Sequence, residues 1–147
     1  PTINGINNIN FLSSAIDSSD NLWFGSDKGI FMYDWTSWHN YYSDRWVNDI
    51  EVDYQGKIWF ATNGGVLKYV DDNWTLITDG LSEQIVWAIF NDSNNNLWVG
   101  TTLGIDKYDG QNLININTSD WLVDNNIFDI CEDKSGNLWF GTIGGGV

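Results

Sequence analysis

Acidic side chains are the residues of this sequence with the clearest potential for chemistry. Asp49 and Asp129 each stand ten residues before a tryptophan, at equivalent places in two similar segments. Two facing carboxylates are the acid and base of glycoside hydrolysis, but equivalent positions of separate structural units are expected to lie far apart. The single histidine, His39, lies beside Trp38 in a segment expected to be exposed, and the sequence supports no Ser–His–acid arrangement around it. The sequence therefore predicts no catalytic residues and no enzyme activity.

Two acidic segments share part of the pattern of a calcium-binding loop. Residues 17–21 (Asp-Ser-Ser-Asp-Asn) and 92–96 (Asp-Ser-Asn-Asn-Asn) place oxygen-bearing side chains on alternate residues. A calcium loop also needs a later bidentate acid and more carboxylates, and neither segment has them. A hairpin turn explains both segments, because Asp accepts backbone N–H groups inside turns. We therefore predict no metal and no cofactor, and we expect Cys131, the only cysteine, to be a small buried hydrophobe.

Two tryptophans beside polar residues form the best candidate binding surface. Trp46 follows Asp44 and Arg45, and Trp121 lies between Asp120 and Asp124, in segments that connect one predicted structural unit to the next. Aromatic faces with short acids and amides nearby suit a sugar ligand, whereas packing of these segments onto a neighbouring unit is the alternative. The candidate ligand-binding residues are Arg45, Trp46, Asp120, Trp121 and Asp124.

A repeated five-residue sequence motif, Asn-Leu-Trp-Phe-Gly, indicates the architecture that positions these residues; we call it the repeated line. It occurs with small changes at 21–25, 57–61, 96–100 and 137–141. Its tryptophans, Trp23, Trp59, Trp98 and Trp139, are separated by 59−23 = 36, 98−59 = 39 and 139−98 = 41 residues. Repeats of this length are typical of propeller blades or solenoid units.

Each repeat predicts a four-stranded antiparallel sheet. Inner strands are expected at 11–16, 47–52, 86–90 and 127–131, each followed by an Asp-led turn and the strand that carries the repeated line. A third strand starts at Gly29, Gly65 or Gly104, and an outer strand starts at Trp38, Trp74 or Leu113. Because the line has large apolar groups on both faces, its sheet must be covered on both sides. The four motif tryptophans are therefore predicted to be structural core residues.

The segment from Asp133 to Thr142 (Asp-Lys-Ser-Gly-Asn-Leu-Trp-Phe-Gly-Thr) resembles the two-component regulator propeller repeat. So do Asp53 to Lys68 and Asp92 to Lys107, and the resemblance covers essentially the whole chain in four copies. It implies an all-β fold, a β-propeller segment of four-stranded antiparallel blades. It also implies a periplasmic or extracellular bacterial sensor that responds to carbohydrates, and it does not imply an enzyme.

Counting strands predicts about three and a half blades in a single segment, residues 1–147. The repeats are expected at about 9–44, 45–80, 85–119 and 126–147, with the last one incomplete. Because closed propellers have about 4–8 blades, the remaining blades are expected from the same parent chain or from a second copy. The sequence also starts at Pro1 without a signal peptide, and a processed or excised piece is the expected explanation.

Charge narrows the possible partners. The chain has 6 basic and 20 acidic residues and a formal net charge of −14, which disfavours nucleic acid and anionic membranes. It also has no apolar run of the roughly 20 residues that a membrane-spanning helix requires. Three functions follow as hypotheses. The chain is a non-catalytic part of an oligosaccharide-responsive sensor, a protein-binding propeller of a cell-surface, secretion or adhesion assembly, or a self-associating lectin-like binder.

Overall fold

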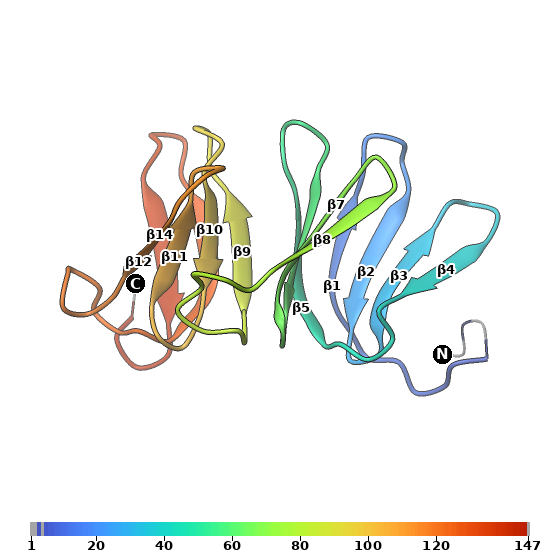
Figure 1. Ribbon diagram of the computed structural model, residues 1–147, viewed down its shortest axis with the longest axis horizontal. Coiled ribbons are helices and arrows are strands. Elements are labelled where there is room, and N and C mark those ends of the chain that lie inside the picture. Colours follow the sequence, from blue (N-terminus) through green and yellow to red (C-terminus); the bar gives the residue numbers. More distant parts are fainter. Residues whose placement is uncertain (1–2, 4, 147) are drawn as a thin grey trace.

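The protein, described by a computed structural model for residues 3 and 5–146, consists of four β-sheets, and these residues form no helix (Figure 1). Three sheets have four antiparallel strands each, and the fourth has two. The sheets stand side by side in chain order, so each is one blade of a propeller. The predicted fold class is thereby confirmed, including the incomplete fourth blade.

The strands of the first two blades are β1 (Phe11–Ile16), β2 (Leu22–Ser26), β3 (Gly29–Tyr33), β4 (Trp38–Tyr41), β5 (Val47–Val52), β6 (Ile58–Thr62), β7 (Gly65–Val70) and β8 (Asn73–Ile77). The third and fourth blades contain β9 (Ala88–Asn91), β10 (Leu97–Gly100), β11 (Ile105–Tyr108), β12 (Leu113–Ile116), β13 (Ile127–Glu132) and β14 (Leu138–Thr142). The predicted strand starts agree with these bounds to within two residues. The division of the chain into repeats at 9–44, 45–80, 85–119 and 126–147 stays a prediction.

Each first hairpin depends on the aspartate that leads its turn. In the third blade, one carboxylate oxygen of Asp92 accepts the backbone N–H groups of Asn94 and Asn96, at 3.0 and 2.8 Å. The other oxygen accepts the indole N–H of Trp98 at 2.8 Å. The same aspartate–tryptophan bond recurs in the other blades, at 2.8 Å for Asp17–Trp23, 3.0 Å for Asp53–Trp59 and 3.1 Å for Asp133–Trp139. The six-residue spacing thus satisfies the turn and the indole together.

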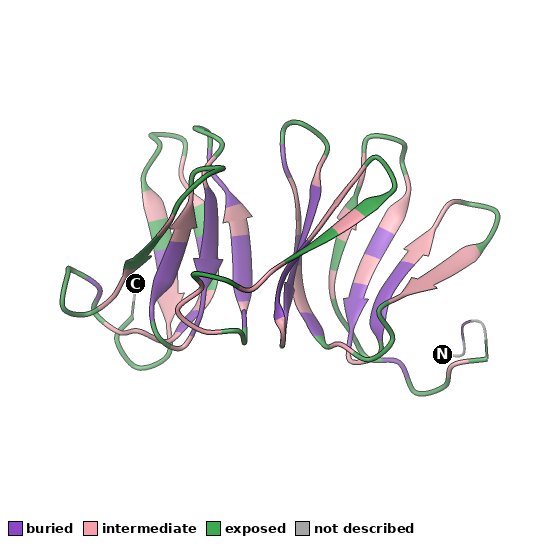
Figure 2. Ribbon diagram, in the orientation of Figure 1, coloured by how far each residue is buried: buried purple, intermediate pink, exposed green. Residues whose placement is uncertain are grey.

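The core lies between blades rather than within one sheet. Trp23 of the first blade packs on Phe60, Tyr69 and Trp74 of the second, with ring centroids 5.7, 5.1 and 6.3 Å apart. In the same direction, Trp59 contacts Tyr108 and Trp98 contacts Phe140. Figure 2 shows buried residues concentrated in the second and third strands of the complete blades, with exposed residues at the turns. Trp23, Trp59 and Trp98 therefore each pack their own blade against the next one.

The fourth blade differs because no later blade covers it in the described part of the chain. Trp139 is 49% exposed, whereas Trp23, Trp59 and Trp98 are between 1% and 7% exposed. Cys131 pairs with Trp139 across the strands and is also exposed. The expectation that Cys131 is buried is therefore wrong, because an alternating strand pattern identifies a face and does not show whether that face is covered.

Candidate functional site

One end of the propeller carries the segments that connect successive blades. These segments, residues 42–46, 78–87 and 117–126, bond to the turns that join the second and third strands. Examples are the N–H groups of Gly65 and Gly104, which donate to the carbonyls of Gln84 and Asn125 at 2.7 and 3.0 Å. We call these segments and the turns 27–28, 63–64, 102–103 and 143–145 the connection rim. It forms the lower edge of the molecule in Figure 1, opposite the Asp-led turns.

Arg45 and Trp46 lie on the connection rim in the segment between the first and second blades. The Arg45 guanidinium donates to the Gly64 carbonyl at 2.9 Å and lies where a side chain at position 64 would be. The Trp46 carbonyl accepts the N–H of Asn63 at 3.1 Å, while its indole is 53% exposed. The backbone of this segment is therefore held in place while the indole faces solvent.

Asp120, Trp121 and Asp124 lie between the third and fourth blades. The Asp120 carboxylate accepts the N–H of Asn117 at 3.0 Å, and Asp124 accepts both the backbone and side-chain N–H groups of Asn126. These hydrogen bonds, first that of the Asn126 backbone, hold the pKa of Asp124 below its ordinary value. Trp121 is 59% exposed, and its ring packs 5.9 Å from that of Phe140.

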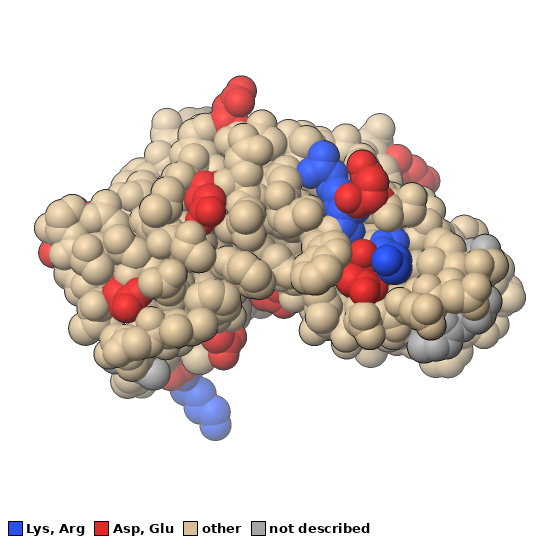
Figure 3. All heavy atoms as spheres, turned by 90° about the horizontal axis from the view of Figure 1, so that it is seen from below, with Lys and Arg blue, Asp and Glu red and all other residues tan. Residues whose placement is uncertain are grey.

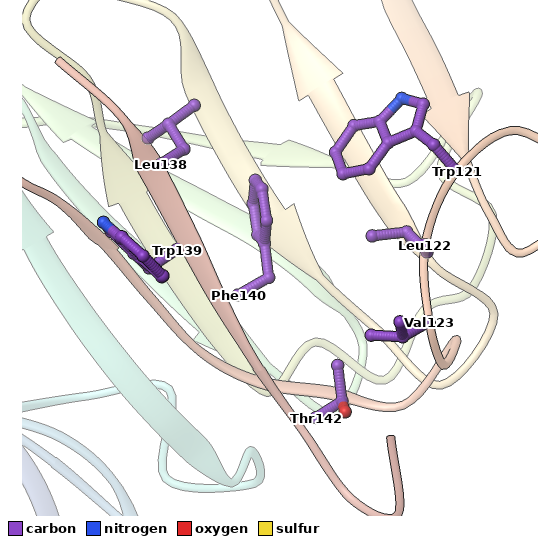
Figure 4. A pocket seen from close by; sticks show the side chains of 7 residues that line it. All are labelled: Trp121, Leu122, Val123, Leu138, Trp139, Phe140 and Thr142. Atoms are coloured by element: carbon purple, nitrogen blue, oxygen red, sulfur yellow. The ribbon is translucent and has the colours of Figure 1, made fainter. Parts of the chain in front are cut away.

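Trp121 lines a cavity of about 280 Å³ beside β14 (Figure 4). Its lining is Trp121, Leu122, Val123, Leu138, Trp139, Phe140 and Thr142. Figure 4 shows Trp121 and Leu122 pointing toward Phe140, with Trp139 on the other side of the strand. Trp46 is not among the lining residues, so the cavity does not unite the five candidate residues.

The connection rim is more apolar than the sequence indicated. The rim residues with exposed large apolar side chains are Tyr42, Trp46, Ile85, Leu103, Trp121, Val123 and Ile143. Figure 3 views this end of the molecule and shows charged side chains as separate patches in a largely uncharged surface. Sequence reasoning missed Ile85, Leu103 and Ile143, although each stands in a short link beside a strand, where a polar residue is usual.

The outer edge of the first blade brings Ser37, His39 and Asp34 together, which was not expected. The His39 Nε2 atom lies 3.2 Å from the Ser37 hydroxyl and 3.0 Å from the Asp34 carboxylate. A catalytic triad uses opposite ring nitrogens for the serine and the acid, whereas both contacts here use Nε2. Hydrogen bonds from Thr36, His39 and Ser37 keep the pKa of Asp34 far below its ordinary value. The cluster is therefore a turn stabilised around a carboxylate.

Acidic residues on the inner strands form hydrogen bonds within their own blade and to the next blade. Asp49 accepts the N–H of Ile50 at 2.9 Å and that of Ile89, in the next blade, at 3.0 Å. Burial raises the pKa of Asp49, those two hydrogen bonds oppose the rise, and the Asp129 charge adds to it. Burial likewise raises the pKa of Glu51 to about 7. Because both Asp49 oxygens already accept backbone groups, this carboxylate is poorly placed to act on a substrate.

The carboxylate oxygens of the Asp-led turns also accept hydrogen bonds from neighbouring protein groups. Besides the Trp98 indole, Asp92 accepts three donor groups: the backbone N–H groups of Asn94 and Asn96 and the side-chain amide of Asn96. Among the described residues, no group of three or more metal-ligand side chains lies together. The hairpin interpretation of these turns therefore accounts for the carboxylates without a cation.

Comparison with protein families identifies the repeat. Residues 41–64, 80–102 and 122–144 match the family described as "Two component regulator propeller". Each match runs from the connection rim through the Asp-led turn to the repeated line and the turn after it. A comparison with curated protein sequences found no match.

Several solved structures have the same fold. The extracellular domain of a putative hybrid two-component system from B. thetaiotaomicron is similar with a TM-score of 0.80 and 23% identity, over 92% of this chain and 21% of that one. An inactive virginiamycin B lyase from Staphylococcus aureus is similar with a TM-score of 0.74 and 14% identity, over 92% and 50% of the two chains. PorZ, a surface component of the type-IX secretion system of Porphyromonas gingivalis, is similar with a TM-score of 0.67 and 18% identity, over 90% and 24%. The chain thus spans about a fifth to a half of these proteins.

Proposed function

Because residues 41–64, 80–102 and 122–144 match the two component regulator propeller family, we propose that the chain is part of the ligand-sensing region of a bacterial two-component regulator. In this proposal the region lies outside the cytoplasm, in the periplasm or at the cell surface. The described part of the chain contains no helix able to cross a membrane. The role of this segment is binding, and it carries out no reaction.

We propose an oligosaccharide as the ligand and the connection rim as its site. The observation that carries this proposal is the exposure of Trp46 and Trp121, at 53% and 59%, on one end of the molecule. Sugar rings present C–H faces that pack on aromatic rings and hydroxyl groups that bond to carboxylates and amides. Asp120 and Asp124 bring such carboxylates to the Trp121 side of the rim. A net charge of −14 favours a neutral or cationic ligand over an acidic one.

A glycan array probed with the purified chain tests this function. The proposal predicts binding to at least one neutral oligosaccharide and loss of that binding in Trp46→Ala or Trp121→Ala. The matched control is Trp35→Ala, which removes an indole of 63% exposure from the opposite end, where it donates to the Asp20 carbonyl. Binding that persists in both rim variants, or that disappears equally in the control, would contradict the proposed site.

A protein-binding propeller of a surface assembly is the second candidate. It is favoured by the apolar character of the rim, because contiguous exposed apolar patches mark interaction sites. Silence on the glycan array together with a protein partner that protects residues 42–46 and 117–126 would favour this function. The self-associating lectin-like binder differs by requiring a dimer in solution, which sedimentation measures directly.

A further inference from the structure

A small cavity lies between the second and third blades, at the end of the molecule opposite the connection rim. Its volume is about 110 Å³. Its lining includes Asp53 and Lys57 of an Asp-led turn together with Lys68, Asn91 and Tyr108. Both blades have all four strands, so the cavity is a feature of two complete neighbouring sheets.

Asn91 departs from the repeat and has an unsatisfied acceptor. At this position, opposite the first residue of the second strand, the first two blades have Ile16 and Val52. The Asn91 side-chain nitrogen donates to the Asn96 carbonyl at 3.5 Å, and the residue is only 5% exposed. No group of the described chain donates to its side-chain oxygen, Oδ1. Because an apolar residue would avoid the cost of burying this oxygen unpaired, the asparagine indicates a donor supplied by a bound molecule.

Two ammonium groups give the cavity a local positive charge in a chain of net charge −14. Lys68 pairs across the sheet with Trp59, and its Nζ atom lies 5.6 Å from the centroid of that ring. Lys57 donates to Gln55 Oε1. No ion pair within the described part of the chain involves either lysine. Both ammonium groups are therefore available to an anion.

The carboxylate of Asp53, which also lines the cavity, already accepts three donors. One oxygen accepts the backbone N–H groups of Gln55 and Lys57, both at 2.9 Å, and the other accepts the Trp59 indole at 3.0 Å. Asn91 Oδ1 is thus the buried acceptor that lacks a donor. An anion with one hydroxyl group matches this lining, whereas an ammonium group would bring three donors to a single acceptor.

The corresponding cavity between the first and second blades has the opposite charge. Its volume is about 240 Å³, and its lining includes Asp17, Asp71 and Asp72 and no lysine. Asn21 stands there in place of Lys57, because 57−21 = 36 equals the step from Trp23 to Trp59. Met32 holds the position of Lys68. Since one repeat builds both cavities, the lysines and the asparagine distinguish the second cavity from the first.

We propose that the cavity between the second and third blades binds a small hydroxycarboxylate. Lys57 and Lys68 bind its carboxylate, and its hydroxyl group donates to Asn91 Oδ1. A volume of about 110 Å³ holds about four water-sized groups of roughly 30 Å³ each, which suits glycolate and excludes an oligosaccharide. This site goes beyond the proposed sensing function at the connection rim and does not depend on it.

Glycolate is the probe, and acetate, which lacks the hydroxyl group, is its matched control. We expect a Kd of about 1 mM for glycolate, because so small a ligand makes few contacts. Acetate should bind about fivefold more weakly, because it leaves Asn91 Oδ1 unpaired. An NMR titration of the isotope-labelled chain measures both affinities through the indole N–H of Trp59 and the side-chain amide of Asn91. The indole of Trp23, which donates to Asp17 of the acidic cavity, should not shift.

The other blades supply the substitutions. Lys68→Met introduces the residue of the first blade and should weaken glycolate binding about tenfold. Lys107→Met is the control, because Lys107 lies 5.1 Å from the Trp98 ring centroid in the same way but does not line the cavity. Asn91→Val introduces the residue of the second blade and should make glycolate and acetate bind equally. Melting temperatures verify that each variant is folded.

Equal binding of glycolate and acetate to the native chain would overturn the proposal. So would equal losses in Lys68→Met and Lys107→Met, or an unchanged Trp59 resonance at about 20 mM glycolate. Inorganic phosphate that binds more tightly than glycolate would also overturn it, because the occupant would then be a phosphate. Glycan binding at the connection rim is read separately on the array, so failure of one proposal is distinguishable from failure of the other.

Discussion

Replacing the motif tryptophans one at a time tests how the blades are held together. Trp98 and Trp139 occupy the same position in successive repeats and make the same bond, to Asp92 at 2.8 Å and to Asp133 at 3.1 Å. They differ in burial, since Trp98 is 7% exposed and Trp139 is 49% exposed. Trp98 also packs on Phe140 and lies under the Lys107 ammonium group, which is 5.1 Å from its ring centroid. Comparing the two substitutions therefore measures how much packing against the next blade, which covers Trp98 but not Trp139 in the described chain, contributes to the free energy of unfolding.

The expected magnitudes follow from the buried area. A fully buried tryptophan removes about 150–250 Å² from water, which corresponds to roughly 4–6 kcal/mol at about 25 cal/mol per Å². For Trp98→Ala we expect a loss of about 3–5 kcal/mol in the free energy of unfolding, in the range of other large core truncations. Trp139 buries about half as much, so Trp139→Ala should cost about 1.5–2.5 kcal/mol. The lost indole hydrogen bond is common to both variants and cancels in the comparison.

Urea unfolding followed by far-ultraviolet circular dichroism measures both values on the same chain. Trp98→Ala is expected to shift the midpoint at least about 1.5 times as far as Trp139→Ala, at an unchanged slope. Equal losses for the two variants would refute the reasoning, because they would show that the turn and its hydrogen bond, rather than packing between blades, determine the tryptophan's contribution.

Three further substitutions test individual contacts. Gly25→Ala should destabilise the fold by about 1–3 kcal/mol, because the new methyl group would lie 2.5 Å from Ser13 Oγ and 2.7 Å from Val47 Cγ1. Gly141→Ala is the control, because the nearest atom to its new methyl group is 3.3 Å away. Thermal unfolding should show a smaller loss of stability for Gly141→Ala than for Gly25→Ala. Glu51→Gln should stabilise the chain by about 1–2 kcal/mol at pH 8 and have little effect near pH 4.5. The reason is that the folded state raises the Glu51 pKa from 4.5 to about 7, so wild-type stability falls as pH rises through that range; a pH-independent effect of the substitution would contradict this. Hydrogen bonds, first from the Asn137 amide, lower the Asp133 pKa to about 2, so wild-type stability falls as the pH drops toward that value. Asp133→Asn should therefore make the free energy of unfolding depend less on pH below pH 4. Urea titrations that show the same decrease in stability below pH 4 for the variant and the wild type would contradict this.

The repetition of one line is what made the fold predictable from sequence. The Asp-led turn, the apolar residues on both faces and the glycine that starts the third strand each recur in phase, so an ambiguous assignment in one repeat is settled by the others. Strand order follows, because short turns between strands lead to antiparallel neighbours. The bonds from Asp17, Asp53, Asp92 and Asp133 to the tryptophan indoles were not predicted, although their constant six-residue spacing was visible.

The candidate site was less predictable because exposure depends on what lies across a blade. Cys131 and Trp139 have the local pattern of buried residues, yet their face is open in the described chain. Ser37, His39 and Asp34 meet through a turn whose geometry no spacing rule specifies. Trp46 and Trp121 do lie on one rim as their positions between repeats indicated, but which side chains share a cavity is decided by the packing of the 117–126 segment onto Phe140.

The most direct test of the proposed sensing function is hydrogen exchange of the chain with and without the neutral oligosaccharide selected on the glycan array. We predict that exchange slows in residues 42–46 and 117–126 of the connection rim and stays unchanged in the Asp-led turns at the opposite end. Protection confined to the Asp-led turns, or no protection anywhere at saturating oligosaccharide, would contradict a ligand site on the connection rim.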